Sequence, residues 1–196
     1  EILVIACNSA TIHAVGSLRA TYPLPIVGME PAVKPASEIT RSGAVGVLAT
    51  EASIEGEKFH QLVNAHAKGV RVITRPCPRF VELVEAGTLE GPEVEEIIDD
   101  AVTPLLESKV DVLVLGCTHY PFLRPVIEQR LPEGVSLLDT GPAVARRVAS
   151  LLSEAPDLSK KSPEIYIETT GSLAQLELLL PKLLPGIDAS TAEAGF

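Results

Sequence analysis

Two cysteines share one sequence context, and their thiols are the groups best placed to do chemistry. Cys7 follows the apolar run 2–6, and Cys117 follows the apolar run 112–116. Short apolar runs of this kind predict strands that are buried on both faces. Small hydroxyl and amide side chains come directly after each thiol: Asn8, Ser9 and Thr11 in the first case, and Thr118 with His119 in the second. Because ligands of α/β proteins bind at the carboxyl ends of parallel strands, we expect both thiols at a binding edge.

Two thiols that face one pocket suit the inversion of a carbon centre by proton transfer. This chemistry needs a base on one face of the carbon and an acid on the other, and cysteine serves in either role. A free thiol has a pKa of about 8.5, so only a few per cent is thiolate at neutral pH. A helix N-terminus after each strand would raise that fraction. The neighbouring hydroxyl and amide groups would hold the substrate, and no cofactor is required.

Cysteines in such positions also have plainer roles in proteins. Each thiol could be a small buried side chain, half of a metal site, or part of a protease-like Cys–His pair. A metal site needs three or four ligands, whereas the remaining histidines (His13, His60 and His66) are scattered over predicted helices. A papain-like enzyme needs one cysteine and not a matched pair. The chain also lacks the glycine-rich motifs that cradle nucleotide phosphates.

Two further residues have a plainer interpretation. Cys77 lies between Pro76 and Pro78, and we place it after no strand end, so we expect a structural thiol. Glu85 follows an apolar cluster and could point inward, although an acid at such a position is more often solvated. The sequence alone therefore gives neither residue a chemical role.

Composition excludes several classes of protein. The chain has 196 residues and a formal net charge of -10, which argues against a general nucleic-acid binder. Its apolar runs are too short for a membrane span. The doublets Arg146–Arg147 and Lys160–Lys161 are expected on solvated helices or loops. An odd count of three cysteines without C-x-x-C spacing suits free thiols in a reducing cytoplasm.

Strand and helix patterns alternate along the chain, which predicts an α/β fold with mainly parallel, doubly wound sheets. We expect strands at 2–6, 26–29, 44–49, 70–74, 111–115, 135–138 and 165–169. We expect a loop and helix cap at 8–11 with a helix from there to about 20, and further helices at 30–41, 51–66, 80–85, 92–109, 122–131, 141–152 and 173–184. The segment 154–163 is expected to be a polar loop, and the tail from 186 is expected to fray. The apolar start at Glu1 suggests that an upstream part is missing.

Several motifs resemble the glutamate racemases of bacterial cell-wall synthesis. They are A-C-N-S-A-T from Ala6 and G-C-T-H-Y-P-F-L from Gly116, with I-V-G-M-E-P, G-V-L-A-T, R-P-C-P-R-F-V-E-L-V-E-A-G and E-T-T-G elsewhere. The resemblance covers nearly the whole chain. Aspartate racemases share the two cysteines but usually carry Glu where His119 stands here.

The resemblance implies cofactor-independent interconversion of L- and D-glutamate, with Cys7 and Cys117 on opposite faces of the α-carbon. His119 would handle protons beside Cys117, and Glu85 would be an acid near the site. Substrate would be held by the following residues: Asn8, Ser9, Thr118, His119, Thr50 and Ser53. A related racemase or isomerase acting on aspartate or another small acid, and an inactive fragment that only binds a small acid, remain as alternatives.

The same resemblance implies two α/β lobes with the site in the cleft between them. One lobe would comprise residues 1–27 and 141–196, and the other residues 28–140. The family's opening D-S-G-x-G-G loop is not present in this sequence, so we expect the isolated chain to be inactive and marginally stable. The expected partner is glutamate, without nucleic acid or membrane, and a homodimer is left open.

Overall fold

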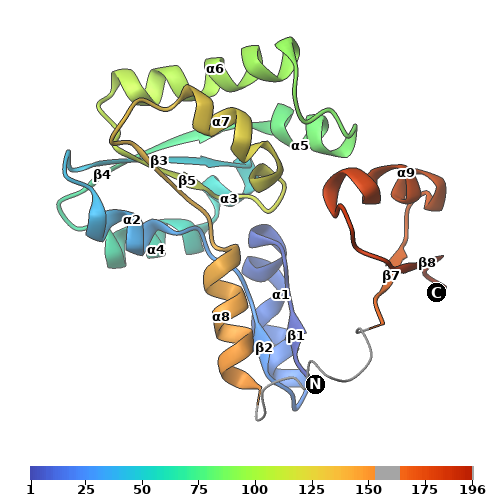
Figure 1. The fold of residues 1–196 in the computed structure, drawn as a ribbon. Helices are drawn as coiled ribbons and strands as arrows, with labels where there is room; N and C mark the ends of the chain where they lie inside the picture. The colour runs from blue at the N-terminus through green and yellow to red at the C-terminus, as the bar shows by residue number, and fades with distance from the viewer. Residues whose placement is uncertain (153–163, 196) are drawn as a thin grey trace.

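The computed structural model describes residues 1–152 and 164–195, and its strands form three separate parallel sheets (Figure 1). The strands are β1 (Leu3–Val4), β2 (Ile26–Val27), β3 (Ala44–Ala49), β4 (Arg71–Pro76), β5 (Val112–Leu115), β6 (Ser136–Leu138), β7 (Tyr166–Thr169) and β8 (Ser190–Glu193). The predicted α/β architecture with parallel strands is confirmed.

Helices connect the strands almost throughout, as parallel pairing requires. They are α1 (Asn8–Thr21), α2 (Val33–Ile39), α3 (Glu51–Glu55), α4 (Glu57–His66), α5 (Pro78–Glu85), α6 (Pro92–Glu107), η1 (Tyr120–Leu123), α7 (Arg124–Arg130), α8 (Gly141–Leu151) and α9 (Leu173–Leu183). Among these described helices, none combines the length and the apolar character needed to cross a bilayer.

The four-stranded sheet has the order β4-β3-β5-β6, and the two cores described below lie on its two faces. Its register aligns Val45 of β3 with Val72 of β4 and with Val112 of β5. Helices cover both faces of this sheet, with α5, α6 and α7 on one side and α2 and α4 on the other (Figure 1). The buried strands therefore meet apolar side chains on both faces, which explains their continuous apolar sequences.

Successive residues of the central strands alternate between two cores. Leu48, Leu113 and Leu115 belong to the core under α5, α6 and α7. Val47 and Val114 belong to the core under α2 and α4. Because β3 and β5 pair in parallel, with Leu48 opposite Leu115, the loops after the two strands leave the same edge of the sheet.

The structure corrects several expected boundaries. The helix expected at 51–66 is two helices, because Gly56 has extended backbone angles (φ -63°, ψ 133°) that break it. The helix expected at 122–131 begins as the 3₁₀ turn η1. The tail expected to fray contains β8, which pairs in parallel with β7. The loop expected at 154–163 lies outside the described residues.

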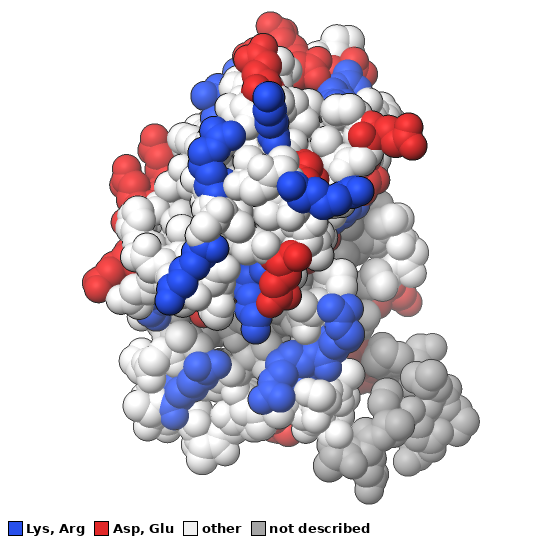
Figure 2. Space-filling model, turned by 90° about the vertical axis from the view of Figure 1, so that its left-hand side faces the viewer, with Lys and Arg blue, Asp and Glu red and all other residues white. Residues whose placement is uncertain are grey.

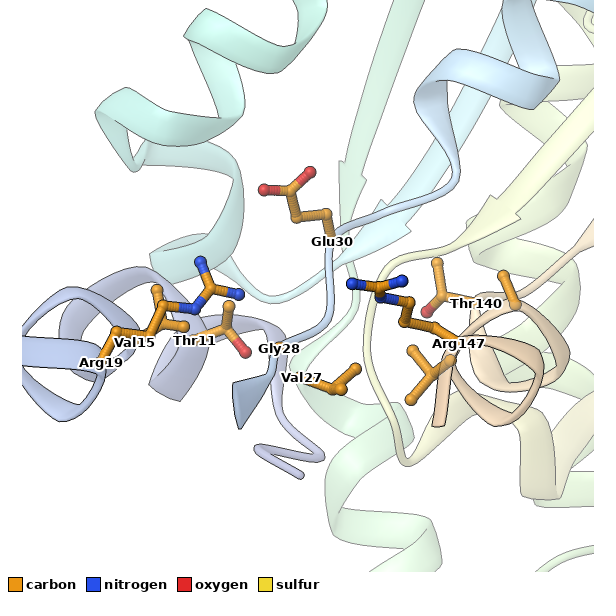
Figure 3. A pocket seen from close by; sticks show the side chains of 10 residues that line it. Thr11, Val15, Arg19, Val27, Gly28, Glu30, Thr140 and Arg147 are labelled. Atoms are coloured by element: carbon orange, nitrogen blue, oxygen red, sulfur yellow. The ribbon is translucent and has the colours of Figure 1, made fainter. Parts of the chain in front are cut away.

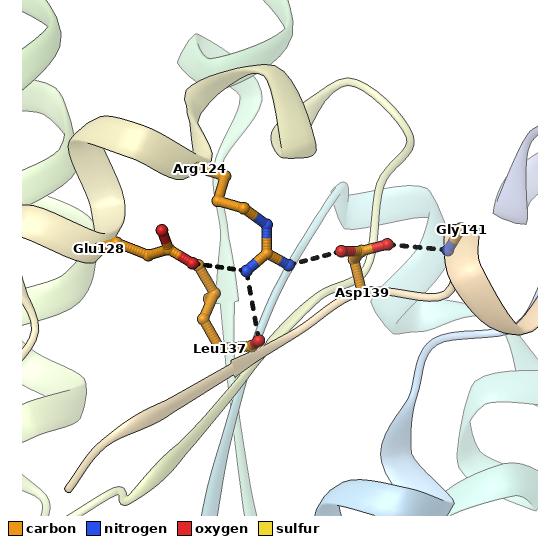
Figure 4. Close-up of polar contacts among 5 residues, drawn as sticks. All are labelled: Arg124, Glu128, Leu137, Asp139 and Gly141. Carbon is orange, nitrogen blue, oxygen red and sulfur yellow. Dashed lines mark hydrogen bonds and ion pairs between the residues drawn. The ribbon is translucent and has the colours of Figure 1, made fainter.

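A charged cluster connects the central sheet to α8 (Figure 4). The Arg124 guanidinium contacts the carboxylates of Glu128 at 2.7 Å and Asp139 at 2.5 Å. Asp139 also accepts a hydrogen bond of 2.8 Å from the backbone N–H of Gly141, the first residue of α8. The segment between β6 and α8 is thus fixed to α7 by charge.

Basic side chains are unevenly distributed over the surface. Figure 2 shows several Lys and Arg side chains together on one face, with acidic groups mostly toward its margins. The chain nevertheless carries 26 acidic against 16 basic residues. Local positive surface therefore exists on an acidic protein.

Candidate active site

The ends of the two cysteine strands are joined by one buried hydrogen bond. The Asn8 side-chain amide donates from Nδ2 to the Gly116 carbonyl oxygen at 2.9 Å, across 108 positions of sequence. Asn8 directly follows Cys7, and Gly116 directly precedes Cys117. The fold therefore brings the two thiol-bearing segments to one place, as their shared context predicts.

Cys7 is the N-cap of α1 and is exposed. Its extended backbone (φ -154°, ψ 127°) directs the side chain across the first helical turn, where Sγ accepts a 3.4 Å hydrogen bond from the Ala10 N–H. The Cys7 side chain thus supplies one of the hydrogen bonds that the free amides at a helix N-terminus need.

Cys117 is half-buried at the carboxyl end of β5 and has a histidine beside it. The Cys117 Sγ lies 3.8 Å from His119 Nδ1, and His119 Nε2 lies 2.7 Å from Glu85 Oε1. The hydrogen bond to Cys117 raises the pKa of His119 to about 9, with the Glu85 carboxylate adding to it and burial opposing it. A protonated imidazole would thus stand between a thiol and a carboxylate.

Three hydroxyl groups form a chain next to Asn8. The Ser9 and Ser53 hydroxyl oxygens lie 3.0 Å apart, and the Thr50 hydroxyl donates to Ser53 Oγ at 2.9 Å. Thr50 is the N-cap of α3, which explains why a polar group closes the buried strand β3. Hydroxyls of this kind both donate and accept, so they suit a substrate with carboxylate and ammonium groups.

The expected site residues thus fall into two connected groups. One contains Cys117, His119 and Glu85, and the other contains Ser9, Thr50 and Ser53. The Asn8 amide connects the two groups through Gly116. Thr118, which stands between Cys117 and His119 in the chain, is half-buried.

Packing of the Cys117 loop depends on residues that the sequence did not single out. A Cβ at Gly116 would lie 2.9 Å from the Ala49 Cβ and 3.0 Å from the Leu48 carbonyl oxygen, so only glycine fits there without movement. Tyr120 is fully buried, and its hydroxyl donates to the Cys77 carbonyl oxygen at 2.8 Å. The only sequence signal for either residue was its place inside the G-C-T-H-Y motif.

The prediction that Cys77 does not follow a strand end was wrong. Cys77 directly follows β4 and is the N-cap residue of α5, which is the context of Cys7. The proline at the end of β4 hid this strand end, and an edge strand tolerates proline. The structural role still fits, because Cys77 is only 4% exposed and burial raises the pKa of its thiol to about 12.

A cavity lies between α1, β2 and α8, and no cysteine is among its lining residues. It measures about 340 Å³ and is lined by Arg19, Gly28, Glu30, Thr140 and Arg147, among others. Figure 3 shows Arg19 and Arg147 on either side of the segment that carries Gly28. The Arg19 guanidinium donates to the Ile26 carbonyl oxygen at 3.0 Å. The sequence pattern placed Arg147 on a solvated helix and did not predict this cavity.

Metal chemistry has no support in the described part of the chain. Within residues 1–152 and 164–195, no group of three or more His, Cys, Asp or Glu side chains could hold a metal ion.

These features define a class of protein: an α/β protein with free cysteines at the carboxyl ends of parallel strands. Residues 1–148 match the family model of the Asp/Glu/hydantoin racemases. The chain belongs to this family.

Curated relatives and solved structures agree with this membership. The chain is 49% identical over 184 residues to the glutamate racemases of Ectopseudomonas mendocina and Pseudomonas entomophila. The alignments cover 93% and 92% of this chain and 70% and 69% of those relatives. The sequence resemblance to glutamate racemases is thereby confirmed.

Two crystal structures show the same fold. The first is Escherichia coli glutamate racemase in complex with L-glutamate and the activator UDP-MurNAc-ala, with a TM-score of 0.85, 34% identity, and coverage of 99% of this chain and 74% of that one. The second is glutamate racemase isoform RacE1 from Bacillus anthracis, with a TM-score of 0.81, 26% identity, and coverage of 100% and 74%.

Proposed function

We propose that the protein is a glutamate racemase that interconverts L- and D-glutamate with two cysteine acid–base groups and no cofactor. The observation that carries this proposal is the Asn8–Gly116 hydrogen bond, because it holds the two thiol-bearing strand ends together. Family membership and the names of the relatives supply the substrate. In the bacterial cytoplasm the product would serve peptidoglycan synthesis.

In the proposed reaction one thiolate removes the α-proton, so an S–H bond forms and the C–H bond breaks. The other thiol then gives its proton to the opposite face of the carbon. Its S–H bond breaks and a new C–H bond forms with inverted configuration. Each turnover exchanges the protonation states of Cys7 and Cys117, and the reverse reaction restores them.

The neighbours of each thiol differ, and so do their proposed tasks. The Ala10 N–H at the start of α1 donates to Cys7 Sγ, and its proposed task is to hold that sulfur in place. Protonated His119 donates from Nδ1 to the Cys117 thiolate, while Glu85 accepts from Nε2 and balances the imidazolium charge. A cation beside a thiolate lowers the free energy of the charged form.

The remaining site residues are proposed to bind the amino acid. Asn8, Ser9 and Thr118 follow the thiols, and the hydroxyls of Thr50 and Ser53 lie next to Ser9. The site would lie in a cleft between a lobe of residues 1–27 and 141–196 and a lobe of residues 28–140. In this proposed division the Asn8–Gly116 bond would join the two lobes.

Exchange of the α-proton in heavy water tests the reaction. The full-length gene product is incubated with L- or D-glutamate in D₂O, and the α-proton signal is followed by NMR while circular dichroism follows racemisation. We expect exchange with both enantiomers of glutamate, and absence of exchange would overturn the proposal. Exchange with aspartate alone would favour the related racemase.

Single thiol variants test the mechanism. Cys7→Ala and Cys117→Ala should each abolish racemisation, whereas the matched control Cys77→Ala should retain it. Racemisation that survives either of the first two changes would disprove the two-thiol mechanism, even if the substrate is correct.

We also propose that the cavity between α1, β2 and α8 binds an anionic regulator. The Escherichia coli relative binds the activator UDP-MurNAc-ala, whose diphosphate is anionic. Arg19 and Arg147 line the cavity, and guanidinium groups suit phosphate. Addition of this nucleotide should raise the racemisation rate, and Arg147→Met should weaken the effect more than Arg146→Met. An unchanged rate over a full titration would refute the regulatory site.

A further inference from the structure

The C-terminal helix α9 packs against the end of α5, the helix that carries Glu85 (Figure 1). The Lys182 ammonium donates to the Gly87 carbonyl oxygen at 3.1 Å, and the Gln175 side-chain amide donates to the Glu85 carbonyl oxygen at 3.5 Å. Leu183 packs against the larger core. Two polar contacts and one apolar contact therefore hold α9 at this helix end.

The end of α5 is a glycine-terminated turn into which α9 fits closely. Gly87 has a positive φ of 66°, and its N–H bonds the Val84 carbonyl oxygen at 2.9 Å. A Cβ at Gly87 would lie 2.9 Å from both Cδ and Nζ of Lys182. The absence of a side chain at Gly87 thus lets the ammonium reach the exposed carbonyl groups of the helix end, where a cation is favourable.

Glu85 is the last residue of α5, and its side chain is 55% exposed. The apolar core therefore does not hold this carboxylate in place. Its 2.7 Å contact with His119 depends on where the last turn of α5 lies. Fraying of that turn would move the carboxylate away from the imidazole.

We propose that Lys182 is a positioning residue: by holding α9 on the end of α5, it fixes Glu85 against His119 and so supports proton handling at Cys117. The C-terminal helix is then coupled to the chemistry through one helix end, although it contributes no group to the reacting atoms. This inference rests on the proposed function for its consequence in catalysis, but its geometric part can be measured without substrate.

The test is a titration of His119 by NMR in the full-length protein, with the signal assigned by its absence in His119→Gln. Lys182→Met should lower the His119 pKa by about 0.2 to 0.7 of a pH unit, because fraying of the α5 end moves the Glu85 carboxylate away from the imidazole. The shift is small because a cation at a helix end contributes only modestly to the stability of that end. Racemisation should fall about two- to fivefold. Lys182→Arg keeps the cation and should restore both values.

Lys68→Met is the matched control, since Lys68 is an exposed lysine in the loop after α4. A Lys182→Met protein that remains folded by circular dichroism and titrates like the control would overturn the inference. If Glu85→Gln also leaves the His119 titration unchanged, the His119–Glu85 contact itself fails, and with it part of the proposed function. Loss of racemisation without any change in the titration would likewise count against Lys182 acting through Glu85.

Discussion

Glu85→Gln offers the sharpest test of the thiol–imidazole–carboxylate arrangement. The parent His119 has a pKa of about 9, raised from an ordinary value of 6.5. At a pH of about 8 such an imidazole is about 90% protonated, whereas one with the ordinary pKa is about 3% protonated. The variant removes the carboxylate while Cys117 remains. The His119 pKa should therefore fall to about 8, so that about half of the imidazole is protonated at a pH of about 8.

The assay is the NMR titration of the imidazole, with a pH profile of racemisation measured alongside. Glu82→Gln is the matched control, because it removes an exposed carboxylate from the same helix. The Glu82 carboxylate pairs with Arg79 and not with His119. The double variant Glu85→Gln, Cys117→Ala should bring the His119 pKa to or below 6.5, since burial then remains as the main influence. A His119 pKa within about 0.2 of the parent in Glu85→Gln would refute the reasoning.

The same pKa predicts how stability changes with pH. The folded protein binds the His119 proton more tightly than the unfolded chain does, because its pKa is raised from 6.5 to about 9. The contribution is therefore complete below pH 6.5 and is lost as the pH rises through about 9. Urea denaturation across this range should show a smaller pH dependence in Glu85→Gln than in the parent.

Three further changes test the scaffold. Asn8→Ala leaves a buried carbonyl oxygen without its donor, so racemisation should fall at least about tenfold and unfolding free energy by about 1–3 kcal/mol, measured by rate assays and urea denaturation. Asp111→Asn should cost about 1–2 kcal/mol at neutral pH. Burial alone would raise the Asp111 pKa, but the hydrogen bonds to its carboxylate outweigh burial and lower the pKa to about 2. The difference in unfolding free energy between Asp111→Asn and the parent should therefore shrink as the pH falls from 3.8 toward about 2, measured by acid denaturation. Arg124→Met removes the ion-pair partner of the mostly buried Asp139 and should lower the unfolding free energy by about 1–3 kcal/mol. Glu128→Gln changes the exposed partner of Arg124 and should lower it by about 0.5 kcal/mol or less. Equal losses for the two variants would show that burial of the pair is irrelevant.

Much of the fold follows from local sequence. The strand at Ala44–Ala49 was predicted to the residue, because a buried parallel strand is continuously apolar and bounded by glycine and threonine. The break at Gly56 was missed because the residues on both sides of it favour helix. The polar strand β8 was missed because it is stabilised by pairing with β7 and not by an apolar pattern.

The site was predictable in its residues but not in its connections. Matching contexts indicated that Cys7 and Cys117 lie at strand ends, and the family resemblance added Glu85. Neither could reveal that the Asn8 amide bonds the Gly116 carbonyl, since local sequence patterns do not show which distant groups meet. The approach of Lys182 to Gly87 is of the same kind.

The hydrogen bond between Asn8 and Gly116 also bears on how the protein folds. Its two ends are 108 positions apart, so it forms only after a very long loop of chain has closed. The helix after Cys7 can form from local contacts, but the two thiol-bearing segments come together only by closing that long loop. Catalytic competence should therefore be among the last properties gained during refolding, and recovery of activity should lag behind recovery of helical signal.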